Sequence, residues 1–127
     1  KPVKINIEIP ENFSVDADSL HLGNVLSNLL DNAVKYSGES VEITIKATGS
    51  ILTVSDNGIG IDKKNLPYIF DKFYRVSSGD RYEVSGYGLG LFYVKQIVSL
   101  FGWSIEAKSQ PGTGTKFIIT INDNGKG

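Results

Sequence analysis

The sequence predicts an α+β fold, a two-layer α/β sandwich in which helices cover one face of a mixed, mainly antiparallel sheet. Segments with alternating apolar and polar residues, as in strands, are interspersed with two segments whose apolar residues recur every three or four positions, as in helices. Several strand-like segments are adjacent in sequence, which favours antiparallel pairing. With 127 residues, 40% of them hydrophobic, we expect a single domain spanning residues 1–127.

The first strand and helix are indicated by a change of period. Residues 3–9 alternate and predict a half-buried strand that ends at a proline. Apolar residues then recur at helical spacing over residues 22–33, so a helix is expected there. Either Asp16 or Asp18 is placed to cap its first turn, and its end is expected near Tyr36.

A β-hairpin is predicted next. Residues 41–45 and 51–54 alternate on either side of a Gly49-Ser50 turn, and the second strand closes on Asp56. A glycine-bearing loop, residues 56–60, follows directly.

The second half of the chain begins with a loop. Residues 74–86 are polar and without a clear period, which is typical of a mobile loop, and loops of this length often act as lids. Helical spacing returns over residues 89–101. Residues 103–107 and 117–121 then alternate as two strands around a turn at 111–114.

Composition excludes several classes of function. The chain has 13 basic and 14 acidic residues and a formal net charge of -1, so no nucleic-acid partner and no direct membrane contact are expected. It has no cysteine, which excludes disulfides and thiolate metal sites and fits a cytoplasmic location. No apolar run is long enough for a membrane span. The one histidine, His21, is interpreted as a structural or surface residue.

Glycines gather in three short loops beside strand or helix ends. They are Gly58, Gly60, Gly86, Gly88, Gly90, Gly112 and Gly114. The sequence contains neither a P-loop nor a complete dinucleotide fingerprint. Residues 86–91 can present backbone amides at the start of the following helix, where phosphate is favoured. For any one of these loops, ordinary turn formation is the alternative and the simpler interpretation.

Polar residues form a stripe on the first helix. Asn28, Asn32 and Lys35 stand at i, i+4 and i+7 and therefore share one face. One interpretation is a solvated polar face. The other is an amide oxygen that binds a hard cation beside a lysine that meets phosphate, since Mg²⁺ needs few protein oxygens when phosphates supply the others.

Asp56 follows an apolar strand and precedes a glycine loop, so its carboxylate is expected to be partly buried and to need a hydrogen-bond donor. The amino group of adenine is such a donor, whereas guanine has an acceptor at that position. An Asp-Asn-Gly turn without a ligand is the alternative.

Five segments in this order resemble the sequence boxes of the catalytic domain of sensor histidine kinases, within the ATPase superfamily of gyrase B, Hsp90 and MutL. They are residues 28–37 (asparagine box), 56–61 (first glycine box), 70–75 (phenylalanine box), 86–91 (second glycine box) and 112–117 (last glycine box). Together they span nearly the whole chain, and the resemblance implies a Bergerat-type ATP-binding fold.

The resemblance also implies roles for individual residues. It implies that Asn32 ligates Mg²⁺ and that Asn28 and Lys35 support the triphosphate of ATP. Asp56 would take the amino group of adenine, assisted by Thr115 through a water molecule.

Further residues are implied to contact the nucleotide through apolar side chains or backbone amides. These are Tyr36, Gly58, Gly60, Ile61, Gly86, Tyr87, Gly88, Leu89, Gly90, Leu91 and Phe117. Arg75 is implied to reach the γ-phosphate, and residues 74–86 to form the ATP lid. Two departures from the family pattern, Phe101-Gly102-Trp103 and Tyr87, remove no expected ligand.

The function that follows is binding of Mg-ATP and donation of its γ-phosphate to a histidine on a separate dimerisation and phosphoacceptor domain, with a response regulator as the partner of the full-length kinase. Nothing in the chain resembles that acceptor motif, so we expect the isolated domain to be monomeric and not to phosphorylate itself. The full-length protein is expected at the inner membrane. Another ATPase or serine kinase of the superfamily, or a degenerate nucleotide-binding regulatory module, is the alternative.

Overall fold

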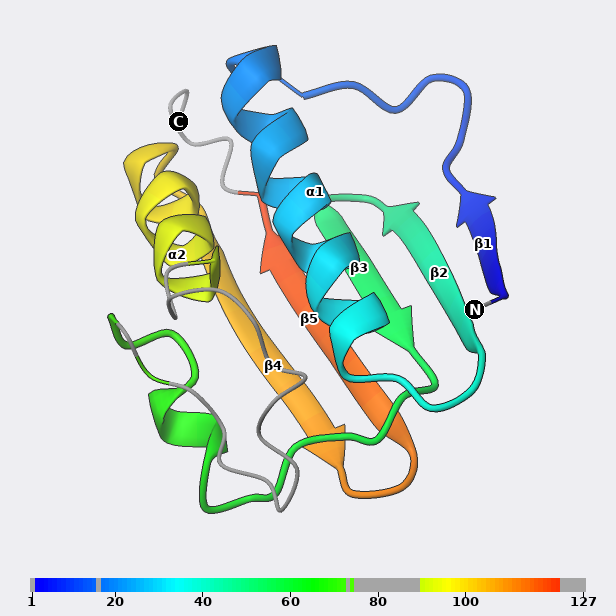
Figure 1. Cartoon of the computed structure of the whole chain (residues 1–127). Coiled ribbons are helices and arrows are strands. Elements are labelled where there is room, and N and C mark those ends of the chain that lie inside the picture. The colour runs from blue at the N-terminus through cyan, green and yellow to red at the C-terminus, as the bar shows by residue number, and fades with distance from the viewer. Residues whose placement is uncertain (1, 16, 73, 75–89, 122–127) are drawn as a thin grey trace.

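The computed structural model describes residues 2–15, 17–72, 74 and 90–121. Within them the chain forms two α-helices, one short 3₁₀ helix and five strands (Figure 1). In chain order these are β1 (Val3–Glu8), α1 (Ser19–Lys35), β2 (Val41–Thr48), β3 (Ile51–Asp56), η1 (Leu66–Tyr68), α2 (Gly90–Leu100), β4 (Ser104–Gln110) and β5 (Gly114–Thr120).

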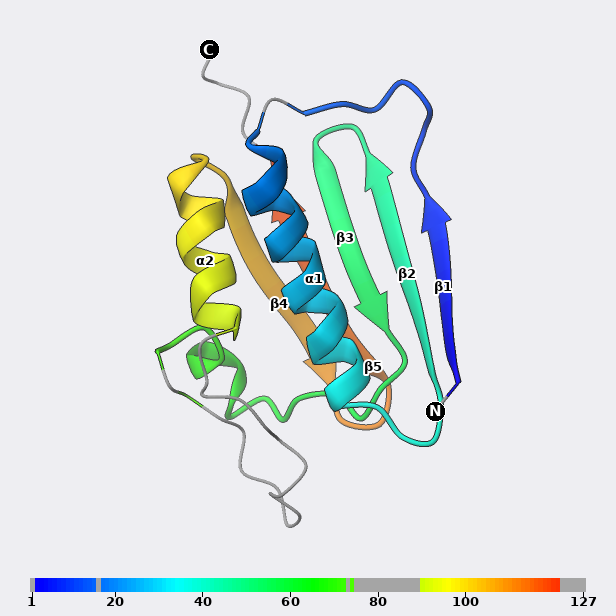
Figure 2. The ribbon, with the colours of Figure 1, turned by 45° about the horizontal axis from the view of Figure 1, so that its top comes forward.

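The five strands form one mixed sheet in the order β1-β2-β3-β5-β4. Strand β1 pairs with β2 in parallel, and the other three pairs are antiparallel. Both helices lie on the same face of the sheet (Figure 1, Figure 2). The predicted fold class, an α+β sandwich with a mainly antiparallel sheet, is therefore confirmed. No helix of the described residues has the length and apolar character that crossing a membrane requires.

Helix α1 begins at a side-chain cap. The Asp18 carboxylate oxygen Oδ1 accepts hydrogen bonds from the backbone N–H groups of Leu20 (2.9 Å) and His21 (3.1 Å), which satisfies two amides that the first turn leaves without helical partners. These bonds, the one from His21 first, lower the pKa of Asp18. Asp18 is therefore the cap, while Asp16 lies outside the described residues. The helix ends at Lys35 with Tyr36 as its C-cap, as predicted.

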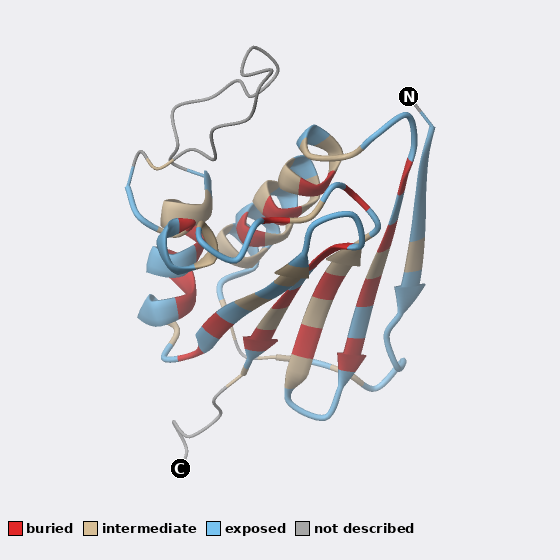
Figure 3. Cartoon of the chain, turned by 90° about the horizontal axis from the view of Figure 1, so that it is seen from below, coloured by how far each residue is buried: buried red, intermediate tan, exposed pale blue. Residues whose placement is uncertain are grey.

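The core lies between the helices and the sheet. Along β2 every second residue is buried, and the buried residues of α1 recur at four-residue spacing (Figure 3). The apolar face of the sheet and the apolar face of the helix therefore pack together as one core. The fully buried side chains of largest volume are Phe117, Leu29, Ile43, Ile119, Val25, Val54, Val94 and Val98.

Strand β1 differs from its prediction. It was expected to be half-buried, but Val3, Ile5 and Ile7 are 45%, 47% and 67% exposed. The reason is its position: β1 is an edge strand, and α1 packs over β2 and β3 (Figure 2). The alternation correctly indicates a strand, but no helix of the described chain covers its apolar face. The strand ends at Glu8, one residue before the predicted end.

Other boundaries shift slightly. The described part of α2 runs from Gly90 to Leu100, whereas the prediction was 89–101, and residue 89 lies outside the described residues. Strands β4 and β5 extend further toward each other than expected, because Gln110 pairs directly with Gly114. The short helix η1 was not predicted.

Candidate functional site

The end of α1, the loop after β3 and the turn between β4 and β5 meet at one end of the sheet (Figure 1). Backbone hydrogen bonds join them: Ile59 N–H donates to the Tyr36 carbonyl (2.9 Å), and Gly112 N–H donates to the Ile59 carbonyl (2.7 Å). Three segments that are far apart in sequence, all containing predicted site residues, are thereby held against one another.

Asp56, the last residue of β3, is half-buried at this meeting point. Its Oδ1 accepts hydrogen bonds from Gly58 N–H (2.8 Å) and from Thr115 N–H (3.3 Å). Burial raises the pKa of Asp56, and these two donors oppose the shift. Within the described residues no hydrogen bond engages the other carboxylate oxygen, Oδ2. Asp56 thus offers one oriented acceptor to a ligand.

Glycine is required where the two loops cross. Gly60 and Gly114 have φ angles of +79° and +107°, which residues with a side chain rarely adopt. A Cβ on Gly60 would overlap the Gln110 carbonyl, and one on Gly114 would overlap the Asp56 carbonyl. These glycines therefore serve close backbone packing, and that packing is what brings Thr115 to Asp56.

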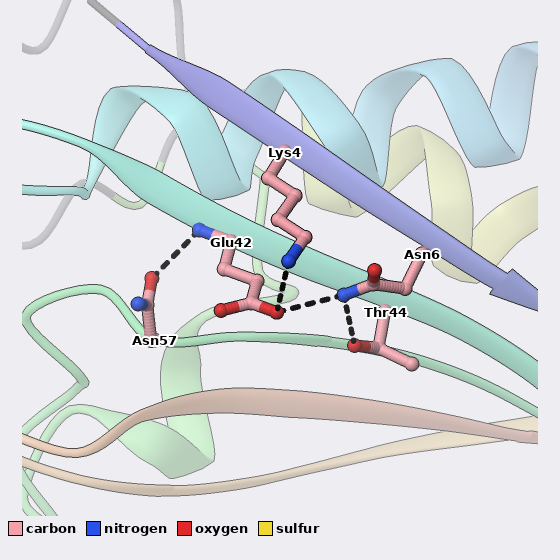
Figure 4. Close-up of polar contacts among 5 residues, drawn as sticks. All are labelled: Lys4, Asn6, Glu42, Thr44 and Asn57. Carbon is pink, nitrogen blue, oxygen red and sulfur yellow. Dashed lines mark hydrogen bonds and ion pairs between the residues drawn. The ribbon is translucent and has the colours of Figure 1, made fainter.

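Asn57 fastens the same loop to the sheet. Its side-chain oxygen accepts a hydrogen bond from Glu42 N–H (2.9 Å) (Figure 4), and its own N–H donates to the Glu42 carbonyl (3.3 Å). The Glu42 carboxylate in turn accepts from Asn6 (2.8 Å) and lies 4.0 Å from the Lys4 ammonium. The sequence analysis did not assign Asn57 this anchoring role, which depends on a strand 15 residues earlier.

Ser109 is a second residue that the sequence analysis missed. Its hydroxyl accepts a hydrogen bond from Ile61 N–H (2.7 Å), donates to the Gly114 carbonyl (2.7 Å) and lies 2.9 Å from the Thr115 hydroxyl. A signal was present: Ser109 continues the inward phase of β4 after Ile105 and Ala107, so a polar side chain stands where apolar ones are expected.

The polar stripe on α1 faces the start of α2. Asn28 is half-buried, and its amide nitrogen donates to the Asn24 carbonyl (2.8 Å). Its Oδ1 lies 3.1 Å from the position that a Cβ on Gly90 would occupy. Asn32 is half-buried and Lys35 is exposed. The two asparagines are therefore only partly open to solvent, whereas the lysine is exposed.

The apolar residues named for the site divide between core and surface. Ile61 and Phe117 are 6% and 1% exposed and belong to the core, whereas Tyr36 and Leu91 are half-buried. The Phe70 ring of the phenylalanine box packs edge-on against Phe117, with ring centroids 6.2 Å apart. This contact ties the segment that precedes the predicted lid to β5.

Several predicted residues lie outside the described residues and have no structural account. They are Arg75, Gly86, Tyr87, Gly88 and Leu89, together with residues 75–86 of the predicted lid. Tyr74, at the start of that lid, is described, and its hydroxyl donates a hydrogen bond to Asn65.

The described residues contain no group of three or more His, Cys, Asp or Glu side chains arranged to hold a metal ion. From the described residues, a Mg²⁺ ion at this end of the sheet would take ligands of another kind. An asparagine amide oxygen together with phosphate oxygens is a suitable donor set, because Mg²⁺ is commonly held by few protein ligands and by substrate phosphates.

Comparison with known proteins shows the family to which the chain belongs. Residues 17–125 match the model of the histidine kinase-, DNA gyrase B- and HSP90-like ATPase family. The chain belongs to this family. Among the relatives, Sensor protein RprX of Bacteroides fragilis is 45% identical over 83% of this chain and 21% of that protein, and Sensor histidine kinase YkoH of Bacillus subtilis is 35% identical over 92% and 26%. The chain thus spans about a fifth to a quarter of the length of these relatives.

Solved structures agree with this assignment. The mycobacterial sensor histidine kinase MprB has a TM-score of 0.81 and 28% identity, covering 94% of this chain and 82% of that one. The catalytic domain of histidine kinase ThkA has a TM-score of 0.72 and 27% identity, covering 94% and 79%. A structure of full-length ShkA in complex with AMPPNP has a TM-score of 0.73 and 25% identity, covering 92% and 25%. The chain is therefore an ATPase-type catalytic domain of the sensor histidine kinases of two-component signalling.

Proposed function

We propose that Mg-ATP binds where the end of α1, the loop after β3 and the β4–β5 turn meet, and that this domain donates the γ-phosphate to a histidine on a separate phosphoacceptor domain. The observation that carries the proposal is the Asp56 carboxylate. Two backbone donors hold its Oδ1, and Oδ2 is left as an acceptor among the described residues. An adenine amino group supplies the missing donor.

The residues around Asp56 support the rest of the nucleotide. Thr115, 7% exposed, stands beside the carboxylate and contacts the base through a water molecule. Asn28 and Asn32 lie one helical turn apart on the α1 face that meets the start of α2. Asn32 binds Mg²⁺ through its amide oxygen, while Asn28 and the exposed Lys35 support the triphosphate.

The segments without a structural account complete the site in this proposal. Backbone amides of Gly88, Leu89 and Gly90 contact the phosphates, Arg75 reaches the γ-phosphate, and residues 74–86 cover the nucleotide as a lid. The complex of the similar protein ShkA with AMPPNP, an ATP analogue, supports a triphosphate ligand for this family of domains.

When bound, Mg²⁺ would neutralise part of the negative charge on the phosphoryl group that is transferred. The protein positions the triphosphate for transfer. Positioning is the main requirement in phosphoryl transfer, because the enzyme itself does little covalent chemistry. The acceptor histidine belongs to a dimerisation domain of the same kinase, and a response regulator takes the phosphate from it. His21, in the first turn of α1, is not proposed as that acceptor, because the sequence around it does not resemble a phosphoacceptor motif.

Calorimetric titration with ATP and GTP, with and without Mg²⁺, tests the proposal on this chain. We expect ATP to bind selectively and Asn32→Asp to change the Mg²⁺ concentration that binding requires. Asn24→Asp is the matched control, since it makes the same change on the same stripe two turns earlier.

Phosphotransfer is then tested by adding a dimeric phosphoacceptor hairpin of a sensor histidine kinase and labelled ATP. Acid-labile label on the hairpin is the expected result. Folded chain that binds no ATP would contradict the proposed site, and ATP binding without transfer to any acceptor histidine would contradict the kinase activity.

A further inference from the structure

We propose that Ser109 is a positioning residue that fixes the Thr115 hydroxyl as a hydrogen-bond acceptor toward the nucleobase, and so contributes to the choice of adenine. The inference rests on the proposed nucleotide site. It follows from counting the protons that the two hydroxyl groups can share.

The Ser109 hydroxyl has one proton and two lone pairs. It lies 2.7 Å from the Gly114 carbonyl oxygen, which can only accept, so at this distance the Ser109 proton must point to Gly114. Ile61 N–H donates to one lone pair of Ser109 over 2.7 Å. One lone pair is left.

The Thr115 hydroxyl lies 2.9 Å from Ser109 Oγ, which is a hydrogen-bond distance. Since the Ser109 proton is already used, the proton of this bond must come from Thr115. Its hydroxyl therefore has no proton left for a ligand, and only its lone pairs are available to one. Toward a ligand, the Thr115 hydroxyl can therefore act only as a hydrogen-bond acceptor.

The neighbouring group has the same polarity. Asp56 Oδ1 is occupied by the N–H groups of Gly58 and Thr115, so the carboxylate also presents an acceptor. Two neighbouring acceptors favour a base edge that donates a proton toward each of them, either directly or by way of the bridging water. Adenine has two protons on its position-6 amino group and none on N1, whereas hypoxanthine and guanine have a carbonyl at position 6 and one proton on N1. At positions 1 and 6 they therefore offer one proton to two acceptors, where adenine offers two.

Ser109 itself does not contact the base. It acts through Thr115, and its own bonds run to β5 and to the loop after β3. A residue that only held these segments together would affect all nucleotides equally. The selectivity between bases, measured as a ratio of affinities, therefore separates the two roles.

The experiment compares ATP with inosine triphosphate, whose base has a carbonyl at position 6 and a proton on N1 and lacks the 2-amino group of guanine. Affinities of both are measured by calorimetry for the unchanged chain, Ser109→Ala and Ser109→Thr. In Ser109→Ala the Thr115 proton is released and can turn toward a carbonyl. We expect the ratio of ATP to inosine triphosphate affinity to fall about fivefold, the equivalent of one neutral hydrogen bond.

Two further variants protect the test against a simple folding defect. Ser109→Thr keeps the hydroxyl and suits a strand, so it should retain the parent ratio. Thr115→Val removes the hydroxyl through which Ser109 acts, so adding Ser109→Ala to it should leave the ratio unchanged.

Equal loss of both affinities in Ser109→Ala, or the same change of ratio in the Thr115→Val background, would overturn the assignment and leave Ser109 as a structural residue. Absence of ATP binding by the unchanged, folded chain is a different result: it would remove the proposed function itself, and the role of Ser109 with it.

Discussion

Replacement of Asp56 by asparagine is the most informative single change to this chain. Gly58 and Thr115 both donate backbone N–H groups to Oδ1, and only an oxygen can accept them. The asparagine amide must therefore keep its oxygen at the Oδ1 position. Its NH₂ group consequently takes the place of Oδ2, where the proposed adenine amino group would meet a donor instead of an acceptor.

The size of the effect follows from the bond that is lost. A hydrogen bond to a charged group contributes about 1.5 to 3 kcal/mol, and an unpaired buried donor costs about 1 to 3 kcal/mol more. A total near 3 kcal/mol lowers ATP affinity by about two orders of magnitude. Because the NH₂ group can donate to a carbonyl, inosine triphosphate should lose less affinity than ATP or gain some.

Calorimetry on the parent and on Asp56→Asn measures both affinities directly. Asp62→Asn is the matched control: it makes the same change of charge in the following exposed segment, at a carboxylate that, within the described part of the chain, accepts a hydrogen bond from Lys64 N–H alone. The reasoning is refuted if Asp56→Asn binds ATP within about threefold of the parent while remaining folded.

Unfolding experiments check that the variant keeps its fold. Burial raises the pKa of Asp56 above 3.8, so the contribution of this carboxyl to stability is fully present below 3.8 and is lost as pH rises through the raised value. At neutral pH the ionised carboxylate is the penalised form. Asp56→Asn should therefore be at least as stable as the parent at neutral pH, and its advantage should shrink as pH falls toward 3.8.

Two further predictions concern the fold that supports the site. Gly114→Ala should destabilise the chain by more than about 2 kcal/mol in urea unfolding, because its φ is positive and the new Cβ meets the Asp56 carbonyl. Gly49→Ala, at positive φ but with open space, should cost only about 1 kcal/mol, and equal losses would show that the crossing of the loops is not constraining. Asp18→Ala should lower the melting temperature at neutral pH. Since the folded pKa of Asp18 is lowered, that difference should vanish as pH falls through the lowered value, and a difference that is independent of pH would argue against the charged cap.

Local patterns in the sequence account for most of the elements. The cap and apolar spacing of α1, the alternation of β2 and the turn at Gly49 depend on residues within a few positions of one another. Such signals can be read from a chain without knowing its partners. The ordered sequence boxes, which span nearly the whole chain, also placed it in the right family.

Local sequence patterns do not show which other element packs against a strand. The alternation of β1 predicted a half-buried strand, but Ile7 is 67% exposed because the strand stands at the edge of the sheet, beyond α1. Burial depends on the order of strands in the sheet, and that order is settled by contacts between distant segments.

Sequence patterns therefore indicate the two α-helices, the five strands, the fold class, the family and the position of Asp56 at the end of a strand. What that carboxylate contacts depends on how distant segments pack together. Thr115 donates to it from 59 residues away, and Ser109 meets Ile61 across 48 residues. Hydrogen bonds over such separations cannot be predicted from periodic patterns in the sequence, because they form only when β3, β4 and β5 have paired.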